Sequence, residues 1–322
     1  MKRYGNLFNS ICDIENIKLA HKNARKKKTH YKEVKQVDSD VDYYCNQIRQ
    51  MLIDKTFVNS PYEIFTKKDK GKTREIYKLP YFPDRIIHHA IVQVVERIWK
   101  NTLITDTYQS IKGRGLHKAI KKIKYRLHTS DEPLYYLKLD IKKYYPSINN
   151  NKLKETIRNK IKCKDTLWLL DIIIDSTVGV PIGNYLSQYF GNLYVSKIDH
   201  EMKETYRLKD YYRYCDDIVV IHRSKSVLHK VKSTVRYRLQ DLDLELKTSY
   251  CVRPIDEGLD FLGVVMYNKH TLIRKKIKLN YALRLREEYN LRVIASYNGW
   301  LLMCNSYNLR NKYEIKRGIK CS

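Results

Sequence analysis

Residues 211–221 have the sequence Y-Y-R-Y-C-D-D-I-V-V-I, and this stretch decides the fold class. Aromatic and β-branched side chains flank two adjacent acids, which predicts a β-hairpin over residues 212–221 with Cys215, Asp216 and Asp217 at its turn. Two neighbouring aspartates in a tight turn are common by themselves. Their place between two apolar strands nevertheless puts two carboxylates at one end of a sheet.

A third acid ends another apolar strand. Asp140 closes the predicted strand 134–140, within the run Y-Y-L-K-L-D-I-K-K-Y-Y-P-S-I. Carboxylates on neighbouring strands, with the backbone carbonyl of Ile141 beside them, are hard oxygen ligands that suit Mg²⁺. Paired divalent ions about 3.5 to 4 Å apart can activate an attacking oxygen and stabilise a leaving one. The three acids therefore predict a site for divalent cations.

The elements around these acids predict an α+β fold. From residue 134 the order is strand, helix, strand, strand, helix, strand, which resembles a split βαβ sheet covered by helices on one face. Upstream, a hairpin is predicted around Lys70, Gly71 and Lys72, followed by two amphipathic helices, and the last forty residues return to helical periodicity. The predicted helices of the central part are 183–197 and 227–239, and the later extended segments are 246–252 and 259–267.

Composition and charge limit the class of partner. The 322 residues include 63 Lys and Arg against 35 Asp and Glu, a formal net charge of +28. A surplus of this size on a chain that is 43% hydrophobic indicates a globular protein that binds phosphate backbones, and an anionic membrane surface is the weaker alternative. No apolar run approaches the roughly 20 residues of a membrane span, and no secretory segment opens the chain, so we expect a cytoplasmic protein without membrane contact.

Cysteine and histidine give no sign of a structural metal. Seven scattered cysteines without a C-x-x-C pair predict reduced thiols. His88 and His89 lie inside an apolar helical pattern, where packing is a better explanation than ligation. We therefore expect no structural zinc.

The motifs resemble those of reverse transcriptases. Tyr214, Cys215, Asp216 and Asp217 resemble the YxDD box, and Asp140 with Tyr144 and Tyr145 resembles the first palm motif. Further segments resemble the fingers, the nucleotide helix, the motif after the YxDD box and the primer grip, in the right order; they are residues 70–91, 106–119, 178–194, 244–249 and 259–267.

One departure narrows the resemblance. Where related enzymes have Q-G-x-x-x-S-P, residues 182–188 have the sequence I-G-N-Y-L-S-Q, which is similar to the reverse transcriptases of diversity-generating retroelements, as are residues 7–28 and 296–309. The resemblance implies a right-hand polymerase with fingers, split-βαβ palm and short helical thumb. The implied divisions are 1–125 for the N-terminal segment and fingers, 126–270 for the palm, interleaved with fingers near 150–185, and 271–322 for the thumb, with no RNase H, maturase or endonuclease domain.

The resemblance also implies roles for particular residues. Asp140, Asp216 and Asp217, with the Ile141 carbonyl, would hold two Mg²⁺ ions, for which Mn²⁺ is a substitute, and Lys247 would protonate pyrophosphate. The residues implied to hold the triphosphate of the deoxynucleotide are Lys68 and Arg74, with Lys72 as a competing candidate. Tyr145 is the implied gate against a ribose 2′-hydroxyl. Ile182 and Gly183 are also implied to bind the deoxynucleotide. Those implied for template and primer are Ser187, Gln188, Tyr214, Cys215, Phe261, Leu262 and Gly263.

The implied partners are deoxynucleotides, a template RNA with its RNA/DNA hybrid, and a small basic accessory protein that forms a pentamer. The implied activity copies a template-repeat RNA into cDNA, with errors opposite adenine, to diversify a target gene. Core packing is the competing explanation of Tyr145, and a solvated strand end is the competing explanation of Lys247. A retron or group II intron-like enzyme is the nearest alternative, and a noncatalytic RNA-binding module is a remoter one.

Overall fold

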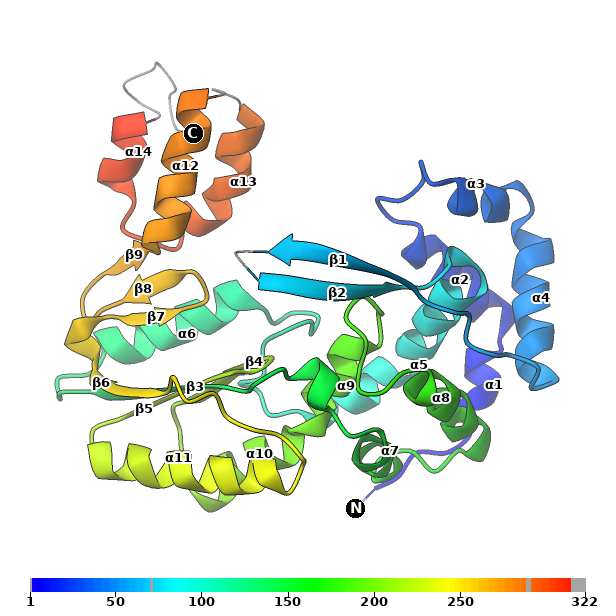
Figure 1. Ribbon diagram of the computed structural model, residues 1–322, viewed down its shortest axis with the longest axis horizontal. Helices are drawn as coiled ribbons and strands as arrows, with labels where there is room; N and C mark the ends of the chain where they lie inside the picture. The colour runs from blue at the N-terminus through cyan, green and yellow to red at the C-terminus, as the bar shows by residue number, and fades with distance from the viewer. Residues whose placement is uncertain (1, 70–71, 288–290, 314–322) are drawn as a thin grey trace. The chain divides into compact units, whose positions relative to one another are not determined.

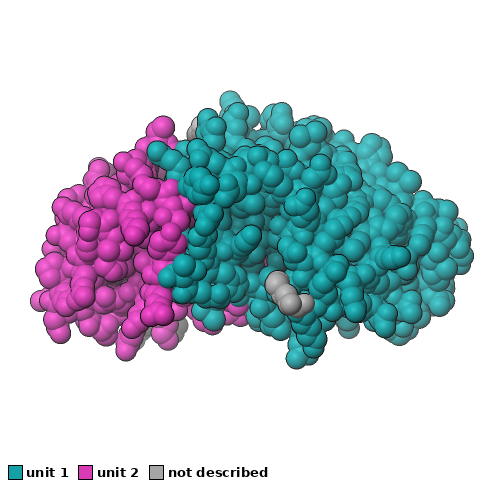
Figure 2. Space-filling view, turned by 90° about the horizontal axis from the view of Figure 1, so that it is seen from below, with its two compact units in different colours: residues 1–105, 141–205, 236–246 teal, residues 106–140, 206–235, 247–322 magenta. Residues whose placement is uncertain are grey.

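The computed structural model describes residues 2–69, 72–287 and 291–313. The chain divides into two compact units, and each unit is assembled from three separate stretches. Unit 1 comprises residues 1–105, 141–205 and 236–246, and unit 2 comprises residues 106–140, 206–235 and 247–322 (Figure 2). Within the described residues, no helix is both long and apolar enough to cross a membrane.

Unit 1 is mainly helical, with one β-hairpin. Two of its helices begin at acidic caps: the Asp13 carboxylate accepts hydrogen bonds from the Glu15 and Asn16 amides, and Asp40 accepts one from Tyr43. Its elements are α1 (Phe8–Ile11), α2 (Ile14–Ala24), α3 (Lys32–Ser39), α4 (Val41–Ile53), β1 (Glu63–Asp69), β2 (Lys72–Lys78), α5 (Ile86–Thr102), α7 (Asn150–Arg158), α8 (Lys164–Asp175), α9 (Ser187–Tyr194) and α10 (Ser196–His200), with short helical turns at Tyr81–Arg85, Tyr145–Ser147 and Glu201–Thr205.

Helix α5 forms the centre of unit 1 and packs against α2. Its apolar residues recur at three- and four-residue steps, and ten of its side chains are buried. His88 and His89 are among them. Burial lowers the pKa of His88 to about 3 and that of His89 to about 4, so both imidazoles are neutral at pH 7.

Unit 2 contains the sheet that carries the predicted acids. The sheet is antiparallel in the order β4-β5-β3-β6 (Figure 1). The elements of unit 2 are α6 (Leu116–His128), β3 (Tyr135–Asp140), β4 (Tyr211–Tyr214), β5 (Asp217–His222), α11 (Lys225–Gln240, whose last turn belongs to unit 1), β6 (Cys251–Pro254), β7 (Leu259–Phe261), β8 (Val264–Met266), β9 (Thr271–Ile273), α12 (Lys275–Glu287), α13 (Leu291–Leu301) and α14 (Tyr307–Tyr313), with a helical turn at Ile255–Glu257.

Both faces of this sheet are covered, which corrects the prediction of helices on one face. On one face Tyr136 and Val219 pack in a cluster with Ile120 and Ile123 of α6. On the other face Leu137 is also buried, and Figure 1 shows α11 on the side opposite α6. Because strand side chains alternate between faces, two apolar sets in one strand require two covering layers.

Two predicted boundaries are wrong. The helix predicted over 183–197 begins at Ser187, and a second helix follows from Ser196. Gly183 has a φ of +131°, a conformation outside the helical region. The extended segment predicted over 246–252 becomes a strand at Cys251, after an isolated bridge between Leu246 and Ile141.

The mixed helix and sheet class is confirmed, as is the hairpin over Tyr211–Tyr214 and Asp217–His222. The Lys70-Gly71 turn lies outside the described residues, as does Cys321. The six described cysteines are free thiols. Beyond β9, three helices pack around a small core that includes Tyr281, Leu285 and Leu301.

Candidate active site

The three predicted acids lie at one end of the sheet of unit 2. Asp140 is the last residue of β3 and Asp217 the first of β5, and their Cα atoms are register partners. Asp216 lies in the turn before β5. Register partners project to the same face of a sheet, so the Asp140 and Asp217 carboxylates share a face.

The turn that carries these acids has an unusual backbone. Cys215 has a φ of +59°, in the left-handed region that non-glycine residues rarely occupy. Arg213 of β4 is completely buried, and its guanidinium Nη1 donates a hydrogen bond to the Cys215 carbonyl at 3.2 Å. The sequence prediction missed Arg213. The sequence signal that could have indicated it is an arginine among aromatic residues, in a strand whose pattern is typical of a buried strand.

Burial and like charge raise the pKa of both turn acids. The pKa of Asp217 rises to about 6, first because the carboxyl is buried and then because Asp216 and Asp140 are negatively charged. The pKa of Asp216 also rises, mainly through burial, with the charge of Asp140 contributing. Carboxylates crowded in this way are stabilised by cations.

Lys247 supplies one such cation. Its ammonium Nζ contacts both carboxylate oxygens of Asp140 at 2.5 Å, and its amide donates to the Asp140 carbonyl at 2.8 Å. In the described part of the chain no three His, Cys, Asp or Glu side chains gather into a metal cluster. The acids still fit Mg²⁺ by chemistry, because their carboxylates offer the hard oxygen donors that this ion prefers.

In unit 1, the segment that carries Ile182 and Gly183 is hydrogen-bonded to the β1–β2 hairpin. The amide of Tyr77 in β2 donates to the Ile182 carbonyl at 2.8 Å. Gly183 allows this approach, since a Cβ there would lie 2.5 Å from the Tyr77 carbonyl oxygen. The Ile182 side chain is half-buried. Ile141, whose carbonyl is a predicted ligand, has a fully buried side chain.

A side-chain network also holds the same segment. The buried Asn184 donates from Nδ2 to the Tyr62 hydroxyl at 2.8 Å, and that hydroxyl bonds Ser176 Oγ at 2.8 Å. The sequence prediction missed Asn184 and Tyr62, because neither residue type signals such a contact. The network fixes the backbone on which Ile182 is carried.

Tyr145, the predicted gate, begins a helical turn and is half-buried. Its carbonyl accepts a hydrogen bond from the Val180 amide at 2.9 Å. Its neighbour Tyr144 is buried and donates from its hydroxyl to the Gly191 carbonyl of α9. The gate position is therefore tied to two later segments of unit 1.

The β1–β2 hairpin carries lysine and arginine side chains on both of its faces. Arg74 is the register partner of Lys67, whereas Lys68 is the partner of Thr73. Since neighbouring strand positions point to opposite faces, Arg74 shares a face with Lys67 and not with Lys68. Lys67 is thus a further candidate that the sequence prediction missed. The side chain of Lys72 lies outside the described residues.

The predicted template and primer residues differ in exposure. Gln188 is exposed on the first turn of α9, whereas Ser187 is buried and donates from Oγ to the Pro181 carbonyl at 2.6 Å. Phe261 is buried in the core cluster of unit 2. Leu262 and Gly263 form the turn between β7 and β8, both with positive φ. Leu262 is half-buried, and Gly263 is buried, with its Cβ position directly against the Trp300 ring. Tyr214 is half-buried and packs against the same cluster.

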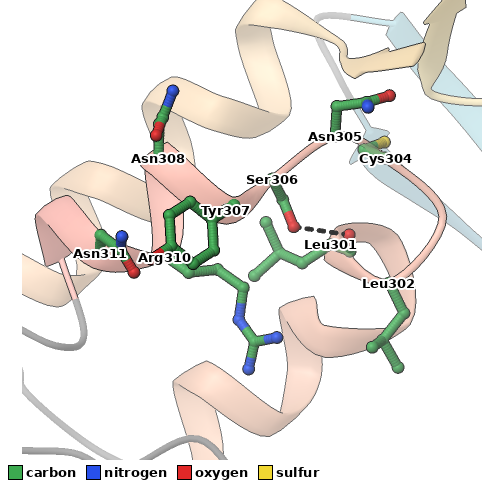
Figure 3. Close-up of a pocket in the computed structure, with 9 residues that line it drawn as sticks. All are labelled: Leu301, Leu302, Cys304, Asn305, Ser306, Tyr307, Asn308, Arg310 and Asn311. Carbon is green, nitrogen blue, oxygen red and sulfur yellow. Dashed lines mark hydrogen bonds between the residues drawn. The ribbon is translucent and has the colours of Figure 1, made fainter. Parts of the chain in front are cut away.

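A cavity of about 500 Å³ lies between α13 and α14 (Figure 3). Ser306 beside it donates from Oγ to the Leu301 carbonyl at 2.7 Å. None of the predicted site residues lines this cavity.

The comparison with protein families identifies the chain's family. The family described as "Reverse transcriptase (RNA-dependent DNA polymerase)" matches residues 65–266. The chain belongs to the reverse transcriptase family. The match covers every predicted site residue, from Lys68 to Gly263.

Curated relatives of this reverse transcriptase include two proteins of Escherichia coli. Protein YkfC of strain K12 is 24% identical over 260 residues, which are 66% of this chain and 66% of that protein. The Retron Ec73 reverse transcriptase is 27% identical over 239 residues, 68% of this chain and 72% of that protein. The chain thus spans about two thirds of the length of the first relative.

Solved structures support the right-hand polymerase fold. Apo telomerase from Candida tropicalis, truncated from its C-terminal domain, has a TM-score of 0.51 at 16% identity, over 70% of this chain and 59% of that one. The C. tropicalis telomerase in complex with a fragment of telomeric RNA has a TM-score of 0.53 at 14% identity, over 83% of this reverse transcriptase and 58% of the telomerase. Both likenesses concern the fold alone.

Proposed function

We propose that this chain is an RNA-directed DNA polymerase of a diversity-generating retroelement, which copies a template-repeat RNA into cDNA with errors opposite adenine. The observation that carries the polymerase is the set of acids at one end of the β4-β5-β3 sheet, in a chain of the reverse transcriptase family. The observation that favours the retroelement is the I-G-x-x-x-S-Q sequence of residues 182–188.

In this proposal Asp140, Asp216 and Asp217 hold two Mg²⁺ ions, or Mn²⁺ in their place. Bound there, the ions supply positive charge for phosphoryl transfer. Arg74 and a lysine of β1 hold the triphosphate, and the Tyr145 ring excludes the 2′-hydroxyl. Lys247 is placed to give a proton to pyrophosphate, because its ammonium already lies beside Asp140.

The proposed macromolecular partners are the template RNA, the RNA/DNA hybrid and a small basic pentameric accessory protein, in the cytoplasm. The net charge of +28 supports the nucleic acids, since phosphates position a duplex on lysines and arginines without reading its sequence. The accessory protein rests on the resemblance of the sequence alone.

Primer extension on an adenine-containing RNA template with deoxynucleotides and Mg²⁺ tests the polymerase. We expect DNA from the wild-type chain and none from an Asp216→Ala, Asp217→Ala double variant. Asp131→Ala, which removes an exposed carboxylate from a loop of the same unit, is the matched control and should keep activity. Tight RNA binding without DNA synthesis, with accessory protein and flanking RNA added, would favour the noncatalytic module.

The errors made during DNA synthesis test the assignment to a diversity-generating retroelement. Ile182 stands where related enzymes have a glutamine, and an isoleucine offers no side-chain hydrogen bond to the nascent pair. Ile182→Gln should therefore lower misincorporation opposite template adenine by about fivefold or more, since a good hydrogen bond contributes about 1 kcal/mol. Sequencing of the products measures this ratio, and an unchanged error spectrum would contradict the assignment of Ile182.

A retron-type enzyme is the second candidate, favoured by the similarity to the Retron Ec73 reverse transcriptase. Accurate copying of the same template by the wild-type chain would support it over the mutagenic retroelement.

A further inference from the structure

We infer that Gly191 of α9 is a positioning residue for sugar selection, because the missing side chain at this position sets where the Tyr145 ring lies. The inference rests on the proposed function, in which Tyr145 is the gate against the ribose 2′-hydroxyl. Gly191 lies within the motif segment 178–194, in the middle of a buried helix, and no role follows for it from the sequence.

The contact itself is short and specific. A Cβ built on Gly191 would lie 2.9 Å from Cε1 and 3.5 Å from Cζ of the Tyr145 ring. It would also lie 3.3 Å from Cε1 of Tyr144. Real Cβ contacts are essentially never shorter than 3.0 Å, so a side chain at this position requires a shift at its contact with the Tyr145 ring.

The backbone that carries the Tyr145 ring is held in place by neighbouring segments. Tyr144 is buried and its hydroxyl bonds the Gly191 carbonyl, which ties α9 to the loop that carries both tyrosines. The Val180 amide bonds the Tyr145 carbonyl, and a Cβ on Gly179 would lie 2.5 Å from the Pro146 carbonyl oxygen. The backbone around Tyr145 is thus confined by close approaches, so a methyl group on Gly191 would press on the half-buried Tyr145 ring.

A glycine inside a helix lowers the stability of the helix, and the close contact with the Tyr145 ring explains why position 191 has a glycine. In a helix interior glycine is less favourable than alanine, because its backbone loses more conformational freedom on folding. A second helical glycine, Gly299 of α13, lacks such a contact, because the nearest atoms to its Cβ position belong to His117 at 3.8 Å. Gly299 therefore offers a matched substitution that adds the same methyl group without pressing on a ring.

The test compares deoxynucleotide with ribonucleotide incorporation. We expect Gly191→Ala to change the ratio of kcat/KM for dATP to that for ATP by about tenfold, the usual effect of one methyl group in a selective pocket. Gly299→Ala should leave the ratio at its wild-type value. Tyr145→Ala alone should admit ribonucleotides, and in that background Gly191→Ala should make no further change, because the ring through which it acts is gone.

An unchanged ratio in Gly191→Ala overturns the inference, as does an equal change with and without the Tyr145 ring. If Tyr145→Ala still excludes ribonucleotides, the gate assignment fails and the inference fails with it. If the wild-type chain makes no DNA under any condition, the proposed function itself is wrong. Should Gly191→Ala not fold, Tyr144→Phe removes the hydroxyl that bonds the Gly191 carbonyl; a wild-type ratio in that variant also overturns the inference.

Discussion

Arg213 brings a positive charge into the interior of unit 2, one strand away from two catalytic candidates. Its guanidinium satisfies the carbonyl of Cys215, a residue with a left-handed backbone conformation. Non-glycine residues in that conformation cost on the order of 1–3 kcal/mol and persist where their surroundings hold them. The arginine is thus a part of the turn that presents Asp216 and Asp217.

Removing this donor should disturb the turn before it disturbs the fold. We expect Arg213→Met to lower kcat by roughly 5- to 100-fold, because an unsatisfied buried carbonyl costs about 1–3 kcal/mol. Arg213→Lys, which keeps the charge and one donor, should recover part of the loss. Cys215→Gly, which relieves the backbone, should recover more of it in the Arg213→Met background. Full kcat in Arg213→Met would show that the hydrogen bond has no part in presenting the acids.

At the scale of elements, the hairpin β1–β2 separates two lysines that are neighbours in sequence. Arg74 and Lys67 share a face, and Lys68 points to the opposite face. If Arg74 binds the triphosphate, Lys67→Ala should raise KM for deoxynucleotides several-fold, and Lys68→Ala should raise it less. Steady-state kinetics on one template measures both. The reverse order would support the assignment of Lys68 made from sequence.

Helix α5 carries a pH dependence of stability. The folded-state pKa of His88 is depressed to about 3, below the unfolded value near 6.5, so the unfolded chain takes up the proton first as the pH falls. The neutral His88 contributes fully to the free energy of unfolding above pH 6.5. This contribution falls towards lower pH by about 1.4 kcal/mol per pH unit for one histidine. His88→Gln should therefore lose less stability than wild type between pH 6.5 and 5. Urea unfolding at both pH values measures the difference, and equal slopes would contradict a neutral buried His88.

The sequence predicts these elements better than it predicts their contacts. Asp140 could be placed at a strand end because an apolar run stops there, and the hairpin of Asp216 could be placed because apolar runs flank it. The start of α9 was missed because Gly183 adopts its conformation to meet the Tyr77 carbonyl, a contact between distant segments. Asn184, Arg213 and Gly191 were missed for the same reason, since their partners are set by tertiary approach.

At the scale of the whole molecule, a net charge of +28 predicts binding that depends strongly on salt. Each phosphate neutralised by a lysine or arginine releases counterions, so the affinity for a short RNA/DNA hybrid should fall by roughly 10³-fold or more between 50 and 200 mM KCl. Fluorescence anisotropy with the Asp216→Ala, Asp217→Ala variant measures binding without turnover. A nearly flat salt dependence would show that the basic surface does not contact the backbone.

The interleaving of the two units has a consequence for biosynthesis. Residues 1–105 are synthesised before the rest of unit 1, and the unit also needs residues 141–205 and 236–246. Unit 2 in turn begins at residue 106 and takes its last stretch from residue 247 onward. Domains usually fold in the order of their synthesis, but here neither can close early. A nascent chain halted before residue 236 leaves both unfinished, with helix α5 and the strand of Asp140 already exposed to chaperones and proteases.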